Sequence, residues 1–183
     1  MLTITIPSRE LYNEATEEFF LVKGQTLNLE HSLLSISKWE QKYKKSFFTT
    51  EFSLKEFVDY VKCMTLNQNV ESSVYNGLTA DNVEAIKNYM GDPSTATTFS
   101  DKNKKPKPKG KAQQRIITSE LIYGWMVGLN IPFECQKWHI NRLITLIRVC
   151  QELENPEKMD KRSILKQNHA LNAARKAKYH TRG

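Results

Sequence analysis

"SLKEFVDYVKCM", residues 53–64, shows the clearest helical pattern in the chain and decides the fold class. Ser53 followed three residues later by Glu56 is the signature of a capping box at a helix start. The apolar side chains that follow recur at the spacing of one helix face: Leu54, Phe57, Val58, Val61 and Met64. We therefore predict one amphipathic helix here, packed with this face against a core.

Similar patterns on either side of this stretch predict further helices. The period is helical over 31–44, and a third helix is expected to start after Thr79 and to end at Gly91. Thr118 is placed to cap a helix over 119–129. Pro132, at a first helical position, then predicts one continuous helix to about Glu154, and a last helix is expected over 161–178.

The N-terminal segment has the alternation of strands. Residues 2–6, "LTITI", predict a short strand that stops at Pro7. Residues 19–22 and 26–29 flank Lys23-Gly24, which we interpret as the turn of a hairpin. The fold class expected is therefore mainly α, a compact helical domain with a small N-terminal β-hairpin or sheet element and an α+β character at the margin.

Charge divides the chain into four segments. Residues 1–101, which include the β element and first helices (1–91), hold nine Lys/Arg and fourteen Asp/Glu. The Pro/Lys-rich loop 92–115 has seven basic residues and no acid over 102–115, and we expect 102–112 to be disordered. Residues 116–157 are expected to complete the same core as a helical hairpin, and 158–183 form a basic tail with eight Lys/Arg and one Asp. The net charge of +7 thus comes from the loop and tail, and the body is acidic.

Composition limits the class of protein. Eight Phe, seven Tyr and three Trp in 183 residues are enough for a core. The chain has no apolar run long enough to cross a membrane and no signal-peptide pattern, so a cytoplasmic protein is expected. Three cysteines in apolar surroundings favour reduced thiols over disulfides.

Cys135 and His139 are the one pair that suggests chemistry. On a single helix their spacing of four would place both on one face, as two zinc ligands or as a nucleophile with its base. Two further metal ligands and an oxyanion hole are lacking at recognisable spacings, and no P-loop, dinucleotide, hydrolase or HExxH motif occurs. We therefore expect no enzyme activity, no metal and no cofactor, with the interpretation of this segment as a buried helix favoured.

The basic segments allow contacts with phosphates or with an acidic protein. Aromatic side chains for base stacking are missing between Phe99 and Tyr123, which disfavours nucleic acid as the partner of the loop. The tail has the composition of a solvated basic helix. The candidate contacts are Lys104, Lys105, Lys107, Lys109, Lys166, Arg175 and Lys176.

The order of several phrases resembles a family of small proteins from long-tailed, non-contractile phages. These phrases are "LEHSLLSISKWEQKYKKSFF", "YVKCMTL", "DPSTATTF", "ITSELIYGWMVGLNIPFECQKWHINRLITLIRVC" and "LKQNHALNAARKAK", and they cover nearly the whole chain. The family is identified as tail assembly chaperones. The resemblance implies a protein that keeps the long helical tape measure protein soluble in the bacterial cytoplasm while tail tube subunits assemble, and many such genes also yield a longer frameshifted product.

Helix-in-groove packing is the binding mode that such a role would need. The surplus aromatic and thioether residues expected to contact the partner, unless they belong to the core, are Trp125, Met126, Phe133 and Trp138, with Arg142 at the rim. Two alternatives remain open. One is a structural virion protein at the tail tip or connector, and the other is a nucleic-acid-binding protein that acts through the basic loop and tail.

Overall fold

The computed structural model describes residues 1–13, 17–99 and 116–154. The chain divides into two compact units, Met1–Ile147 and Arg148–Gly183, and the account below concerns the first. The predicted last helix (161–178), the basic tail and the predicted disordered loop 102–112 lie outside the described residues.

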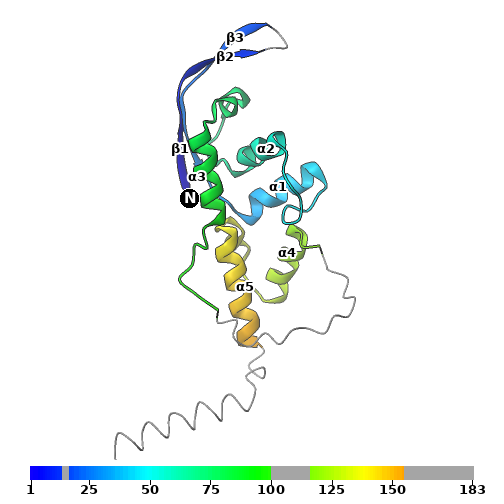
Figure 1. The fold of residues 1–183 in the computed structure, drawn as a ribbon. Coiled ribbons are helices and arrows are strands. Elements are labelled where there is room, and N and C mark those ends of the chain that lie inside the picture. Colours follow the sequence, from blue (N-terminus) through cyan, green and yellow to red (C-terminus); the bar gives the residue numbers. More distant parts are fainter. Residues whose placement is uncertain (14–16, 100–115, 155–183) are drawn as a thin grey trace, which may run out of the picture. The chain divides into compact units, whose positions relative to one another are not determined.

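In the described residues, four short strands precede five α-helices and two 3-10 helices (Figure 1). The strands are β1 (Leu2–Ile6), β2 (Arg9–Asn13), β3 (Glu18–Val22) and β4 (Gln25–Leu29). The helices are α1 (Leu33–Tyr43), α2 (Leu54–Met64), η1 (Ser72–Gly77), α3 (Ala80–Gly91), α4 (Ser119–Gly128), η2 (Phe133–Lys137) and α5 (Ile140–Glu154). The mainly helical class with a small β element is therefore confirmed.

The predicted hairpin at Lys23-Gly24 is wrong. β4 pairs antiparallel with β1, and β3 pairs antiparallel with β2, so the two predicted hairpin strands lie in the same arm of a long two-stranded ribbon. The ladder is interrupted at Pro7, which has no N–H to donate. Gly24 lies opposite this break, where a Cβ would come within 2.8 Å of the Ser8 nitrogen. The glycine therefore serves a close approach of two backbones, not a turn.

The alternation predicted for residues 2–6 is confirmed. Ile4 and Ile6 are buried, whereas Thr3 and Thr5 are exposed and contact the side chains of Asn28 and Thr26 across the ladder. The buried face of this sheet packs against α3, which runs alongside β1 (Figure 1). The strand pattern thus places one apolar face of the ribbon in the core.

The helix starts at 54, 80 and 119 are confirmed by their caps. Ser53 and Glu56 form the capping box of α2, and Thr79 and Thr118 accept hydrogen bonds from the first turns of α3 and α4. Leu54, predicted on the apolar face of α2, is instead 78% exposed, although Glu56 and Phe57 in the same turn are buried.

The core between α1 and α2 is aromatic. Trp39 of α1 is fully buried, and its indole Nε1 donates to the Glu56 carbonyl oxygen at 3.0 Å. Its ring contacts Phe47 and Phe52, and Phe47 in turn packs on Tyr60 of α2 with ring centroids 4.4 Å apart. This cluster fixes the loop between the two helices against them.

The single helix predicted from Pro132 to Glu154 is also wrong, because two elements occupy this stretch. The 3-10 helix η2 ends at Lys137, and Trp138 is extended before α5 begins. The backbone N–H of Ile140 donates to the His31 carbonyl at 2.7 Å, and Ser32 and His139 form a β-bridge. These long-range bonds satisfy backbone groups that a continuous helix would have paired internally.

Candidate functional site

A buried pair of histidines lies where α1, α2, α3 and α5 meet. The rings of His31 and His139 are edge-to-face with centroids 5.2 Å apart, and both residues are buried. His31 Nδ1 is 2.5 Å from the Tyr60 hydroxyl, and His139 Nε2 is 3.0 Å from the Tyr89 carbonyl oxygen. Helices α2 and α3 and the segments that precede α1 and α5 are therefore joined at one point.

This junction is electrically neutral at physiological pH around His31. Burial, and secondarily the neighbouring His139, lower the pKa of His31 from 6.5 to about 3. Burial raises the pKa of the Tyr60 phenol, which stays protonated. A neutral imidazole paired with a neutral phenol suits a packing role.

Cys135 and His139 do not share a helix face, which corrects the geometry predicted for them. Cys135 is buried in η2, whereas His139 follows the break and faces His31 and Tyr89. Within the described part of the chain, no three His, Cys, Asp or Glu side chains are grouped so that they could hold a metal ion. The cysteines are free, and burial raises the pKa of the Cys63 thiol, which disfavours its thiolate.

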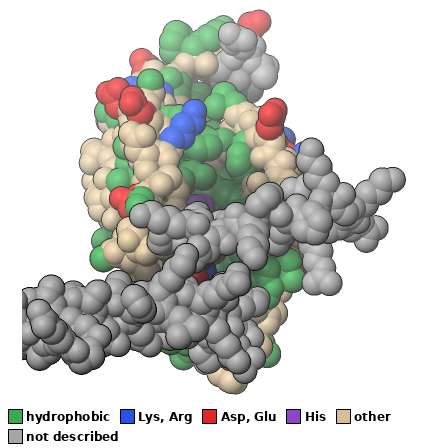
Figure 2. Space-filling view, turned by 60° about the horizontal axis from the view of Figure 1, so that its bottom comes forward, with side chains coloured by type: hydrophobic (Ala, Val, Ile, Leu, Met, Phe, Trp, Pro, Cys, Tyr) green, Lys and Arg blue, Asp and Glu red, His purple; other side chains and the backbone are tan. Residues whose placement is uncertain are grey.

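One face of the described residues is hollowed and apolar (Figure 2). Figure 2 shows the hollow lined by hydrophobic side chains, with a histidine side chain on its floor. His31 and His139 are the two histidines among the described residues, so the histidine in Figure 2 is one of them. At the histidine junction itself, Phe47 contacts the ring of His31 and Tyr89 contacts the ring of His139.

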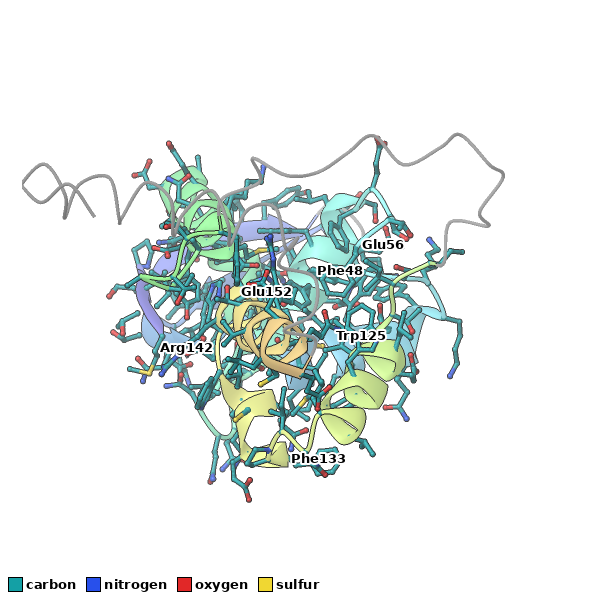
Figure 3. All side chains as sticks on the ribbon, turned by 90° about the horizontal axis from the view of Figure 1, so that it is seen from below. Phe48, Glu56, Trp125, Phe133, Arg142 and Glu152 are labelled. Carbon is teal, nitrogen blue, oxygen red and sulfur yellow. The ribbon has the colours of Figure 1, made fainter. Side chains whose placement is uncertain are left out.

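The residues predicted to contact a partner do not form one surface. Met126 is fully buried and belongs to the core. Trp125 is half-buried, and seen from below it lies near Phe48 on one side of α5, whereas Arg142 lies on the opposite side (Figure 3). Arg142 is stacked over the ring of Trp138, with its guanidinium carbon 4.2 Å from the ring centroid. Trp138 and Arg142 thus form a local cation–π pair of their own.

Phe133 belongs to an exposed apolar surface that the sequence did not single out as a whole. Its ring centroid is 6.2 Å from that of Tyr123 on α4, and the Tyr123 hydroxyl donates to Gln136 Oε1 of η2 at 2.8 Å. Val127 follows Tyr123 by one helical turn on the same face. Val127 is 61% and Phe133 52% exposed. We call these three side chains, Tyr123, Val127 and Phe133, the α4–η2 surface.

The α4–η2 surface is held on a well-anchored helix. Glu40 of α1 is buried and accepts hydrogen bonds from the backbone N–H of Ser119 at 2.7 Å and of Phe47 at 2.8 Å. The first of these bonds ties the start of α4 to α1, and Ile122 and Met126 then pack inward. The opposite side of α4 is therefore the one that faces outward.

The helical periodicity of residues 119–128 is the feature of the sequence that could have indicated the α4–η2 surface. Ile122 and Met126 are four residues apart and define the inward face, which places Tyr123 and Val127 on its flank. The predicted phosphate or acidic-partner contacts, Lys104, Lys105, Lys107, Lys109, Lys166, Arg175 and Lys176, lie outside the described residues.

Comparison with models of protein families, with curated proteins and with solved structures gives no match to this chain. None of the helices in the described ranges has both the length and the apolar character that crossing a membrane requires.

Proposed function

We propose that this protein is a non-enzymatic tail assembly chaperone of a long-tailed phage, which binds apolar helical segments of the tape measure protein. The observation that carries the proposal is the α4–η2 surface, where Val127 and Phe133 are exposed and the half-buried ring of Tyr123 lies beside that of Phe133. The resemblance of the sequence phrases supplies the identity of the partner. The acidic body and the neutral His31–Tyr60 pair give no reason to assign a reaction.

Helix-in-groove binding supplies the physical mechanism. A tape measure helix that has not yet been enclosed by the tail tube exposes an apolar stripe, and exposed stripes of this kind aggregate. Val127 and Phe133 offer a complementary apolar surface, and aromatic anchors of interfaces commonly contribute about 2 kcal/mol or more each. The Tyr123–Gln136 hydrogen bond fixes α4 relative to η2, so little order has to be gained on binding.

Affinity capture from phage-producing cells tests the proposal. A tagged full-length chain is recovered at about 0.5 M salt, which removes contacts held only by phosphate charge, and bound proteins are identified by mass spectrometry. We expect one very long helical protein to be recovered. We also expect the double substitution Val127→Ser with Phe133→Ser to reduce this recovery strongly, because it removes the apolar contact.

Leu54→Ser is the matched control. Leu54 is 78% exposed on α2, so this substitution removes a comparable exposed aliphatic group elsewhere and should leave recovery unchanged. Recovery of nucleic acid alone at low salt, with no protein at high salt, would contradict the proposal. Stoichiometric amounts of the chain in purified particles would favour the structural virion protein instead.

A further inference from the structure

The ribbon β2–β3 presents an apolar face that is separate from the α4–η2 surface. Tyr12 pairs with Phe19 across the ladder, and Glu10 pairs with Leu21, so these side chains lie on one face. Tyr12, Phe19 and Leu21 are 51%, 68% and 63% exposed. The rings of Tyr12 and Phe19 are in contact, with centroids 5.0 Å apart. We call this group, with Glu10, the ribbon face.

The opposite face of the ribbon is fixed to the body. Val22 is fully buried, and β3 packs against η1. Arg9 donates from its guanidinium to the carbonyl oxygens of Asn76 and Leu78, at 3.2 and 3.4 Å. These contacts hold the other face of the hairpin against the body, so the hairpin cannot rotate to bury the ribbon face. A two-stranded ribbon that exposes aromatic rings on one side has an incomplete apolar layer.

The surroundings of the ribbon face are acidic. Glu10 lies on the ribbon face, Glu17 precedes β3, and Glu18, which pairs with Asn13, lies on the opposite face of the hairpin. All three are exposed, and none of them takes part in an ion pair among the described residues. In the described residues, β2 and β3 pair only with each other, and neither strand contains a lysine or a proline to protect its edge. The chemistry that complements this face is a segment with basic and large apolar side chains together.

We propose that the ribbon face binds residues 158–183 of a second copy of this chain. That segment has eight Lys/Arg and one Asp, and it also contains the apolar residues Ile164, Leu165 and Leu171. The other basic segment, 102–115, has seven Lys/Arg but no large apolar side chain, so it complements only the charge. Contact between two ribbon faces would bring like charges together and is disfavoured for that reason.

Such a contact joins two different surfaces and is heterologous. It leaves one ribbon face and one tail free at the ends of every dimer, so association continues into rings or open chains. The electrostatic part weakens with salt, while the apolar part persists. Self-association that rises with protein concentration and falls only in part at high salt is the behaviour expected.

Sedimentation velocity of the full-length chain at several concentrations, with two synthetic peptides as competitors, tests the proposal. The peptides 158–183 and 102–115 each have a net charge of +7, so they are matched in charge and differ in apolar content. We expect the mass to rise with concentration, and we expect the 158–183 peptide to reverse this rise at concentrations at which the 102–115 peptide does not. A mass that stays monomeric throughout, or equal inhibition by both peptides, would overturn the proposal.

Substitutions assign the contact to the ribbon face. Tyr12→Ser with Phe19→Ser removes both rings and should weaken self-association by about tenfold or more, as expected for aromatic anchors. Glu10→Lys leaves the rings in place and should weaken it by reversing the charge on the ribbon face itself, which gives a second test if the first variant folds poorly. Self-association that both variants retain in full contradicts the assignment.

The Phe133→Ser variant distinguishes a failure of the self-association proposal from a failure of the chaperone proposal. Phe133 lies on the α4–η2 surface, so this variant should keep the self-association of the unmodified chain while it loses capture of the long helical partner. If the ribbon variants lose partner capture but sediment like the unmodified chain, the self-association proposal is refuted. The chaperone proposal is then tested separately, by the capture experiment with the Val127 and Phe133 substitutions.

Discussion

Acid is expected to destabilise this protein through His31. The imidazole is 4% exposed, and burial together with His139 lowers its pKa from 6.5 to about 3. The titratable groups around it are Tyr60 of α2 and His139, with Tyr89 of α3 and its partner Glu30 one contact further away. Because the folded pKa is depressed, the unfolded chain binds a proton more readily than the folded chain as pH falls below 6.5. Stability is therefore lost as pH falls through this window.

The size of this loss of stability follows from how far the pH falls below 6.5, the pKa of the imidazole in the unfolded chain. Between about pH 7.5 and pH 5.5 the unfolded imidazole becomes mostly protonated while the folded one stays neutral, which costs about 1 to 2 kcal/mol of unfolding free energy. The figure is insensitive to the folded pKa as long as it stays well below 5.5. Glu56, whose pKa is lowered to about 2 chiefly by the hydrogen bond from Lys45, loses its contribution only at lower pH.

Urea unfolding, followed by tryptophan fluorescence at the two pH values, measures this loss. In His31→Asn the amide oxygen replaces Nδ1 as the partner of the Tyr60 hydroxyl, and nothing at this position titrates. We expect this variant to be less stable at high pH but to lose about 1 to 2 kcal/mol less on acidification. Equal pH dependence in both proteins, or an NMR titration midpoint of the folded His31 imidazole above pH 5.5, would refute the reasoning.

Two further substitutions test the packing of the body. Glu40→Ala leaves the buried N–H groups of Phe47 and Ser119 without their acceptor, so chemical denaturation should show a loss of about 2 to 5 kcal/mol, whereas Glu40→Gln keeps one acceptor oxygen and should lose less. Gly77→Ala places a Cβ within 2.6 Å of the Ile6 side chain and should cost about 1 to 3 kcal/mol. Gly91→Ala, the control at the end of α3, meets nothing within 4 Å and should stabilise the helix by up to about 1 kcal/mol in the same assay; a loss there as large as at Gly77 would contradict the packing argument.

The helix starts could be predicted because their signals are local. Ser53, Thr79 and Thr118 each bond to a backbone N–H three residues ahead, so the sequence within one turn contains both partners. The apolar faces that follow have the period of a helix, and the inward side of α2 and α3 agrees with it apart from Leu54, the first residue of α2. Leu54 fails there because periodicity does not show where the core ends.

The strand pairing could not be predicted because it is decided by contacts between distant residues. Lys23-Gly24 has the composition of a turn, yet Gly24 is needed for its close approach to Ser8, sixteen residues away along the chain. The break before α5 has a similar origin. The N–H of Ile140 donates to the carbonyl oxygen of His31. This acceptor is distant in sequence, so the residues of 131–154 alone could not predict the bond.

The partner surface was predicted by residue type, and residue type does not specify a face. Met126 and Val127 are neighbours in sequence, but the first is fully buried and the second 61% exposed. Phe133 could be proposed from the sequence because it is a large aromatic residue in a polar 3-10 segment. Tyr123 and Val127 join it only once the inward face of α4 is known.

The two proposed surfaces have different chemistry, and a chaperone for a very long helical partner needs both kinds. The α4–η2 surface is apolar and suits a stripe that recurs along the partner, whereas the ribbon face combines apolar and acidic groups and suits the basic tail of a neighbouring copy. A chaperone copy held to its neighbour meets the next stripe at a high effective concentration, so a weak single contact is enough to cover a long helix. The ribbon variants should therefore weaken binding to a long partner much more than binding to one short helical peptide, while Phe133→Ser should weaken both alike.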